Sequence, residues 1–163
     1  MAAKRSAGIL LFRRVNPALE VLIGHMGGPF WARKDAGGWS VPKGEYGEDE
    51  TPEAAARREF TEELGLPVPA GDLISLGELR QSGGKVVTIW ALESDLDPAA
   101  VVPGTFDLEW PRGSGRLQAF AELDRVEWCE LEQARDRLVK GQRPFLDVLS
   151  NLLSDRLSDG RPG

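Results

Sequence analysis

The sequence has little of what several kinds of functional site require. It contains one cysteine, Cys129, and one histidine, His25, in 163 residues. A single cysteine excludes an intramolecular disulfide, and it excludes zinc and iron–sulfur sites that are built from several thiolates. We therefore expect a reducing compartment. Cys129 follows Trp128 in an apolar run, which predicts a buried strand residue rather than a nucleophile.

Long apolar runs and an excess of positive charge are also absent. The run from Ala7 to Phe12 is much shorter than the roughly 18 residues of a membrane span, and no small-residue cleavage site follows it. The net charge of -6 disfavours nucleic acid and anionic membranes as partners, because both attract basic surfaces. We expect a cytoplasmic protein, and a polyphosphate ligand would need a divalent metal as mediator.

The composition is that of an ordinary globular chain, with 41% hydrophobic and 28% charged residues. This length favours a single domain over residues 1–163 that buries enough apolar surface to fold unaided. The sequence leaves the oligomeric state open.

Short apolar runs bounded by turn signals predict strands, and helical spacing predicts two terminal helices. The expected strands are 7–12, 20–24, 39–41, 73–80, 85–92 and 125–129, and the expected terminal helices are 131–138 and 144–157. Residues 94–119 contain three prolines and three glycines, which predicts a long variable loop or insertion. This order of elements indicates an α/β or α+β fold with a mixed sheet covered on both faces.

The best-marked element is a central helix over residues 52–64. Thr51 is suited to cap its first turn, Pro52 suits the first helical position, and Gly65 favours a left-handed stop. Its apolar residues recur every four positions, which predicts one face packed against a sheet.

Three carboxylates, Glu59, Glu62 and Glu63, fall within an arc of roughly 100° on this helix. Such like charges repel one another unless a cation neutralises them, and oxygen ligands suit Mg²⁺ or Mn²⁺. Arg58 lies four residues before Glu62 and is placed to pair with it, and Glu50 is placed to join Arg58. The alternative interpretation is a solvated, glutamate-rich helix face.

The spacing of these residues favours the metal interpretation, because it matches a long motif. The pattern is G-x5-E-x7-R-E-U-x-E-E-x-G-U, where U is a bulky apolar residue. Its positions are Gly44, Glu50, Arg58, Glu59, Phe60, Glu62, Glu63, Gly65 and Leu66. A full match would arise by chance in about one in a million such sequences. The chain resembles the Nudix hydrolases, whose signature box would span residues 44–66.

The resemblance extends over roughly residues 6–157. The approach segment from Trp39 to Gly44 is similar to that of the dinucleoside polyphosphate hydrolases within the family. It implies an α/β/α sandwich with a mixed sheet. It also implies Mg²⁺- or Mn²⁺-dependent hydrolysis of a nucleoside diphosphate linked to another group. Diadenosine tetraphosphatases usually carry a tyrosine where this chain has Gln81 to Gly84, so a nucleoside triphosphate stays open as the substrate.

The resemblance also implies roles for the box residues. Glu59, Glu62 and Glu63 would be metal ligands, with Arg58 holding one carboxylate in place, and one glutamate would orient or deprotonate the attacking water. The backbone carbonyl of Gly44 would add a further ligand.

Many family members use one more carboxylate from a loop before the tryptophan of the last strand. Glu122 is the candidate here, as an extra ligand or base. Glu109 and Glu127 are rivals, and a plain surface carboxylate is the alternative for each.

Candidate substrate contacts lie outside the box. Lys43 and Lys85 are expected to pair with phosphates, although Lys85 is equally suited to solvent. Arg112 and Arg116 lie among glycines, where they would either close over a polyphosphate or serve as solubilising charges.

The aromatic residues leave a choice between base stacking and the core. Trp110, like Trp31 and Trp39, is a candidate to stack on a nucleobase, and burial in the core is the alternative for all three. His25 follows a strand on a glycine-rich stretch, where it would contact phosphate, act as a base or have a structural role.

Together these features predict a metal-dependent pyrophosphohydrolase acting on a small-molecule nucleotide, with a dinucleoside polyphosphate ahead of a nucleoside triphosphate. A nucleotide-sensing Nudix module that does not turn over its ligand is the alternative of a different class. Removal of a 5′ cap or pyrophosphate from RNA is disfavoured by the lack of a basic stripe.

If Arg112 and Arg116 close over a polyphosphate, replacing both with alanine should raise KM for longer polyphosphates and leave short ones unaffected. Steady-state kinetics across a series of chain lengths would measure this. A KM that is unchanged at every length would assign both arginines to solubility.

Overall fold

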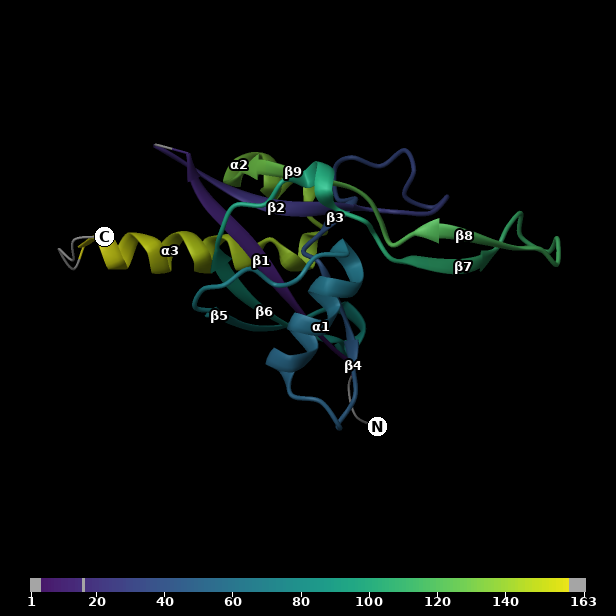
Figure 1. Cartoon of the computed structure of the whole chain (residues 1–163), viewed down its shortest axis with the longest axis horizontal. Coiled ribbons are helices and arrows are strands. Elements are labelled where there is room, and N and C mark those ends of the chain that lie inside the picture. The colour runs from purple at the N-terminus through teal and green to yellow at the C-terminus, as the bar shows by residue number, and fades with distance from the viewer. Residues whose placement is uncertain (1–3, 16, 159–163) are drawn as a thin grey trace.

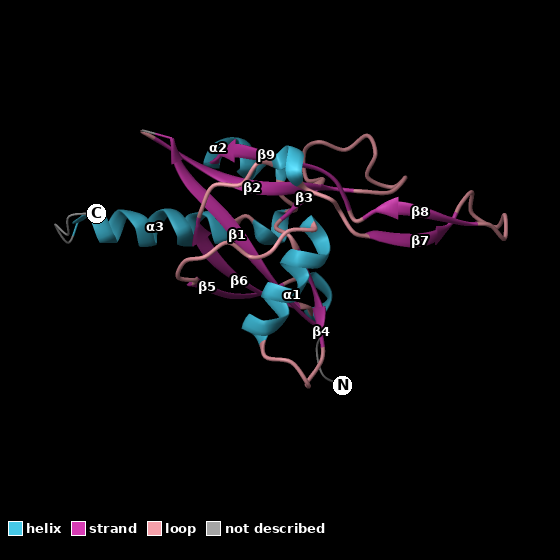
Figure 2. Ribbon diagram, in the orientation of Figure 1, coloured by secondary structure: helices cyan, strands magenta, loops and turns pink. Residues whose placement is uncertain are grey.

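The computed structural model describes residues 4–15 and 17–158 (Figures 1 and 2). The strands are β1 (Arg5–Val15), β2 (Ala18–Met26), β3 (Trp39–Ser40), β4 (Lys43–Tyr46), β5 (Ile74–Arg80), β6 (Val86–Glu93), β7 (Thr105–Glu109), β8 (Leu117–Ala121) and β9 (Leu123–Glu130). The α-helices are α1 (Pro52–Leu64), α2 (Leu131–Arg137) and α3 (Pro144–Ser158). Within this described part, no helix is long and apolar enough to cross a membrane.

The main sheet is mixed and opens between β1 and β2. β6 runs parallel to β1 along Arg5–Phe12 and occupies one edge of that strand. β2 and β4 therefore share the other edge, β2 at Phe12–Val15 and β4 at Arg5–Gly8. In the same way β9 occupies one edge of β2, which leaves the other edge to β1 and β3. β1 and β2 diverge, and residues 39–46 fill the opening between them.

A glycine in β1 permits this arrangement. A Cβ atom at Gly8 would overlap the carbonyl oxygen of Pro42 and would lie 2.6 Å from the Cβ of Lys43. The backbone of residues 42–43 therefore crosses directly against Gly8, and the amide of Ile9 donates to the Pro42 carbonyl over 3.3 Å.

Apolar side chains alternate along β1 and build a core on each face of the sheet. On one face Ala7, Ile9 and Leu11 pack with helix α1. On the other face Leu10 and Phe12 pack with α2 and α3. The result is the expected α/β/α sandwich, which has a mixed sheet between helices.

Helix α1 has the predicted bounds and ends. The Oγ1 of Thr51 accepts a hydrogen bond from the amide of Ala54 over 3.2 Å. Gly65 adopts φ +67°, and its amide donates to the Thr61 carbonyl over 2.8 Å. These two ends fix which turn of the helix faces the opening in the sheet.

Three strands were not predicted from the sequence: β7, β8 and β4. The segment predicted as a long loop, 94–119, contains the strand β7 and most of β8, which pair with each other as a separate two-stranded ribbon. Figure 1 shows this ribbon projecting from the body of the molecule. The prolines and glycines of the segment lie outside these two strands. Because they closely flank the strands, the segment as a whole has the composition of a loop, and the short alternation of apolar and polar residues within each strand was missed. β4 was also missed, because the short polar sequence Lys-Gly-Glu-Tyr has no apolar pattern.

Replacing Gly8 with alanine is expected to lower the free energy of unfolding by about 1–3 kcal/mol, because the new Cβ must displace the backbone of residues 42–43. Gly47→Ala is the matched control, since a Cβ there meets only the carboxylate end of Asp49, at 3.2 Å. Denaturant unfolding of both variants measures the difference, and equal stabilities would contradict the crossing described above.

Candidate functional site

Arg58 is the centre of an ion-pair network at the start of the site. Its guanidinium forms two hydrogen bonds with the Glu50 carboxylate, of 2.7 and 2.8 Å. It also donates to Glu59 over 2.7 Å and to Glu62 over 3.2 Å. The predicted pairings of Arg58 with Glu50 and Glu62 are confirmed, and the bond to Glu59 is an addition. The hydrogen bond from Arg58 lowers the pKa of Glu50.

Glu59 lies under the backbone of β4. A Cβ atom at Gly44 would overlap the Glu59 carboxylate, so only glycine leaves space for it. Glu59 is 9% exposed, and this burial raises its pKa even though Arg58 opposes the shift. The backbone of Gly44 and the carboxylate of Glu59 are therefore in direct contact.

Glu63 faces a cavity of about 140 Å³, which it shares with Lys43 and Glu122. Burial, followed by the charges of Glu122 and Glu59, raises the pKa of Glu63 to about 8. Lys43 opposes this shift, while burial lowers the pKa of Lys43 itself. Three ionisable side chains thus surround one small cavity. Glu63 comes from helix α1, Lys43 from β4, and Glu122 from the link between β8 and β9.

Glu122 is the extra carboxylate that the structure brings to this cavity. Its amide donates to the Gly104 carbonyl over 2.8 Å, and its carbonyl accepts from the Gly27 amide over 3.0 Å. Burial, followed by the charge of Glu59, raises its pKa. The two rivals lie elsewhere. Glu109 accepts a 2.7 Å hydrogen bond from the Gly113 amide on the ribbon, and Glu127 pairs with Arg137 over 3.3 Å.

A larger cleft of about 700 Å³ adjoins the small cavity, and Lys43 lines both. Lys85 lines the cleft as well, so the two predicted phosphate-binding lysines are brought together. Trp31, Gln81 and Gln142 also line it, and neither glutamine was among the sequence candidates. The buried Gln142 accepts from the Val41 amide and donates to Ser40, contacts that no local sequence pattern indicates.

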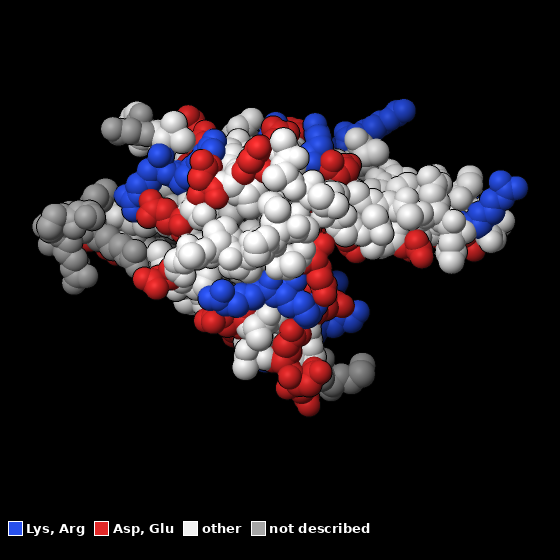
Figure 3. All heavy atoms as spheres, in the orientation of Figure 1, with Lys and Arg blue, Asp and Glu red and all other residues white. Residues whose placement is uncertain are grey.

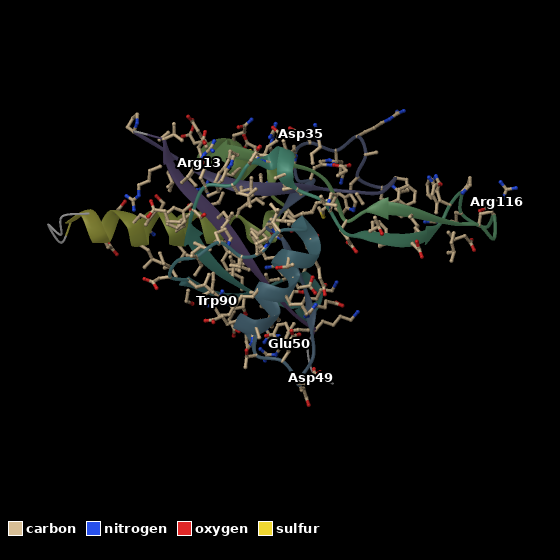
Figure 4. The ribbon with its side chains drawn as sticks, viewed as in Figure 1. Arg13, Asp35, Asp49, Glu50, Trp90 and Arg116 are labelled. Atoms are coloured by element: carbon tan, nitrogen blue, oxygen red, sulfur yellow. The ribbon has the colours of Figure 1, made fainter. Side chains whose placement is uncertain are left out.

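The other predicted substrate contacts lie on or beside the ribbon. Arg112 and Arg116 are exposed in the turn between β7 and β8, and Figure 4 shows Arg116 at the outer end of the ribbon. Trp110 packs edge-to-face against Phe30, with ring centroids 5.6 Å apart. None of these three residues lines the cleft or the small cavity.

His25 and Trp39 have structural roles. His25 is 1% exposed, its Nε2 donates to the Lys34 carbonyl over 2.6 Å, and its Nδ1 bonds the Asp124 carboxylate over 2.7 Å. Trp39 is fully buried against the edge of the His25 ring. Cys129 is buried as predicted.

Acidic charge exceeds basic charge around the small cavity, and Figure 3 shows further acidic side chains at the tip beside α1. In residues 4–15 and 17–158, no three Asp, Glu, His or Cys side chains already converge as a metal cage. Arg58 instead holds Glu59 and Glu62. The donor set nevertheless fits a hard divalent cation, because all its atoms are oxygen and the mutually repelling carboxylates of Glu59, Glu63 and Glu122 outnumber the two cationic side chains beside them, Arg58 and Lys43.

Comparison with known proteins identifies the class. The family model of the NUDIX domain matches residues 3–149, so the chain belongs to the Nudix family. As a member of this family it is a hydrolase that acts on phosphoric anhydride bonds. No curated protein matches it in sequence.

Several solved structures share the fold. One is a C. elegans Ap4A hydrolase in a binary complex, 22% identical, with a TM-score of 0.64 over 92% of this chain and 98% of that chain. The NUDIX domain of Shewanella oneidensis NrtR, complexed with ADP ribose, is 17% identical, with a TM-score of 0.62 over 94% of this chain and 90% of that chain. The E. coli ORF135 protein is 22% identical, with a TM-score of 0.59 over 96% of this chain and 94% of that chain.

The raised pKa of Glu63 predicts a pH-dependent stability in metal-free protein. Below pH 4.5 Glu63 is protonated in both the folded and the unfolded chain. As pH rises through about 8, the proton that the folded chain holds more tightly is lost, and the free energy of unfolding falls with it. Glu63→Gln should remove this loss and raise Tm at pH 8.5 by about 3 °C or more. Thermal melts in EDTA from pH 5 to 8.5 measure it. The control is Glu48→Gln, an exposed carboxylate, and identical pH profiles in the two variants would contradict the prediction.

Proposed function

We propose that this protein is a Mg²⁺- or Mn²⁺-dependent pyrophosphohydrolase that cleaves a dinucleoside polyphosphate. The observation that carries the proposal is the juxtaposition of the Glu63, Glu122 and Lys43 cavity with the larger cleft. The small cavity would hold the reacting phosphate, and the cleft of about 700 Å³ beside it has a volume typical of small-molecule binding sites.

Glu59, Glu62, Glu63 and the Gly44 carbonyl would hold the metal. When bound, such an ion lowers the pKa of water and offsets charge on phosphate oxygens. Arg58 fixes the carboxylates of Glu59 and Glu62 by hydrogen bonds before any ligand binds. This preorganisation reduces the rearrangement that binding requires.

Two of the carboxylates are suited to accept a proton from the attacking water. Burial raises the pKa values of Glu63 and Glu122, which makes each a stronger base in its deprotonated form than a free carboxylate. Glu122 comes from outside helix α1, so it is free to act as the base while the box glutamates serve as ligands. Lys43 and Lys85 would contact the polyphosphate from the cleft.

The substrate class has separate support. The approach segment from Trp39 to Gly44 resembles that of dinucleoside polyphosphate hydrolases, and a C. elegans Ap4A hydrolase shares the fold. The presence of every box carboxylate argues for turnover rather than sensing alone. The single buried cysteine is consistent with a cytoplasmic location.

A substrate panel tests the proposal. Diadenosine polyphosphates, nucleoside triphosphates, ADP-ribose and NADH are incubated with and without Mg²⁺, and the products are separated by chromatography. We expect ATP and AMP from diadenosine tetraphosphate only with metal, and Glu63→Gln should lower kcat at least about 100-fold. Glu53→Gln, which removes an exposed carboxylate paired with Arg57 on the same helix, is the matched control and should keep its activity.

Other outcomes are equally informative. A preference for triphosphates would change the substrate class to nucleotide-pool cleansing. Binding without turnover of any nucleotide would favour the sensing module. Full activity of Glu63→Gln would show that the metal site is wrongly placed.

A further inference from the structure

Trp31 is distinguished from the other candidate aromatics by its place in the large cleft. Of the three tryptophans considered for base stacking, Trp39 is fully buried in the core. Trp110 packs on Phe30 beside the ribbon. Trp31 is partly exposed and lines the same cleft as Lys43 and Lys85. It is therefore the member of this set whose ring is available to a ligand.

The segment that carries Trp31 is held by several bonds. The Trp31 amide donates to the Gly28 carbonyl over 3.3 Å, and its carbonyl accepts from the Lys34 amide over 2.9 Å. The Lys34 carbonyl is in turn held by the buried His25, and the ammonium of Lys34 lies 5.4 Å from the centre of the Trp31 ring. A platform fixed in advance in this way loses little conformational entropy when a ligand binds.

We propose that Trp31 is the nucleobase-stacking residue of this enzyme, with Lys85 and Lys43 contacting the phosphates of the same nucleotide. A flat indole and two cations lining one cleft of about 700 Å³ match the two chemical halves of a nucleotide. The proposal rests on the proposed function for its substrate class. Because every base has a π-face, stacking on Trp31 should bind adenine and guanine nucleotides with similar affinity.

Binding and turnover are measured separately, so that this inference and the proposed hydrolysis can fail independently. The affinity of the wild-type chain for ATP and for inorganic tetraphosphate is measured by calorimetry with Ca²⁺ in place of Mg²⁺, because the phosphates need a divalent metal as mediator, and KM and kcat for diadenosine tetraphosphate are measured with Mg²⁺. Trp31→Ala should weaken ATP binding and raise KM about tenfold with little change in kcat. Tetraphosphate, which has no base, should bind unchanged.

Two further variants separate stacking from structure. Trp31→Phe keeps an aromatic face and should recover most of the affinity. Trp90→Phe is the control, because Trp90 (labelled in Figure 4) lies on β6, packs with the core on the α1 side and is not among the residues that line the cleft, and it should leave the binding of both ligands unaffected.

Each remaining outcome has one meaning. Equal losses for ATP and tetraphosphate in Trp31→Ala, or no loss for either, would overturn the stacking assignment. The same holds if the wild-type chain binds neither ligand. A selective loss of ATP binding in a chain that hydrolyses nothing would retain Trp31 as the base-binding residue and reject the proposed hydrolysis.

Discussion

The divergence of β1 from β2 is the constraint on which the rest of the site depends. Once the two strands separate, residues 39–46 fill the gap, which places Lys43 and Gly44 against Gly8 and Ala7 of β1. Gly8 allows the crossing, and Gln142 holds residues 40–41 from the opposite layer. Helix α1 then brings Glu59 against Gly44. A continuous β1–β2 hairpin would leave no place for any of these groups.

Electrostatics acts on this frame in two opposite ways. Near Arg58 the carboxylates are paired, and the pKa of Glu50 is held low. Around the small cavity they are not, and the pKa of Glu63 rises to about 8. Arg58 therefore offsets part of the negative charge on one side of the helix, whereas Glu63 and Glu122 share only Lys43 and keep a surplus of negative charge that a cation would relieve. This division suits a site that must be rigid yet still attract a ligand.

Local patterns predicted the parts of the structure that local physics controls. The bounds of α1 follow from Thr51, Pro52 and Gly65, and the paired carboxylates follow from helical spacing. What the sequence could not supply depends on contacts between distant segments. β4 forms because β1 offers it an open edge, and no residue pattern signals that. Gln142 reaches the site across a separation of more than 100 residues. The sequence named Glu122 ahead of Glu109 and Glu127, but only the fold shows that Glu122 lines the small cavity and that its rivals do not.

The two ends of the ribbon meet at one hydrogen bond, from the Glu122 amide to the Gly104 carbonyl. The chain leaves the body and returns to it at the same point, immediately beside the candidate base. The outer turn of this excursion therefore lies away from the small cavity, while Trp110 packs on Phe30 of the body. That turn, with Arg112 and Arg116, is open to change in length and charge during evolution without displacing Glu122. The architecture thus joins a small acidic cavity to an appendage whose outer turn takes no part in lining it.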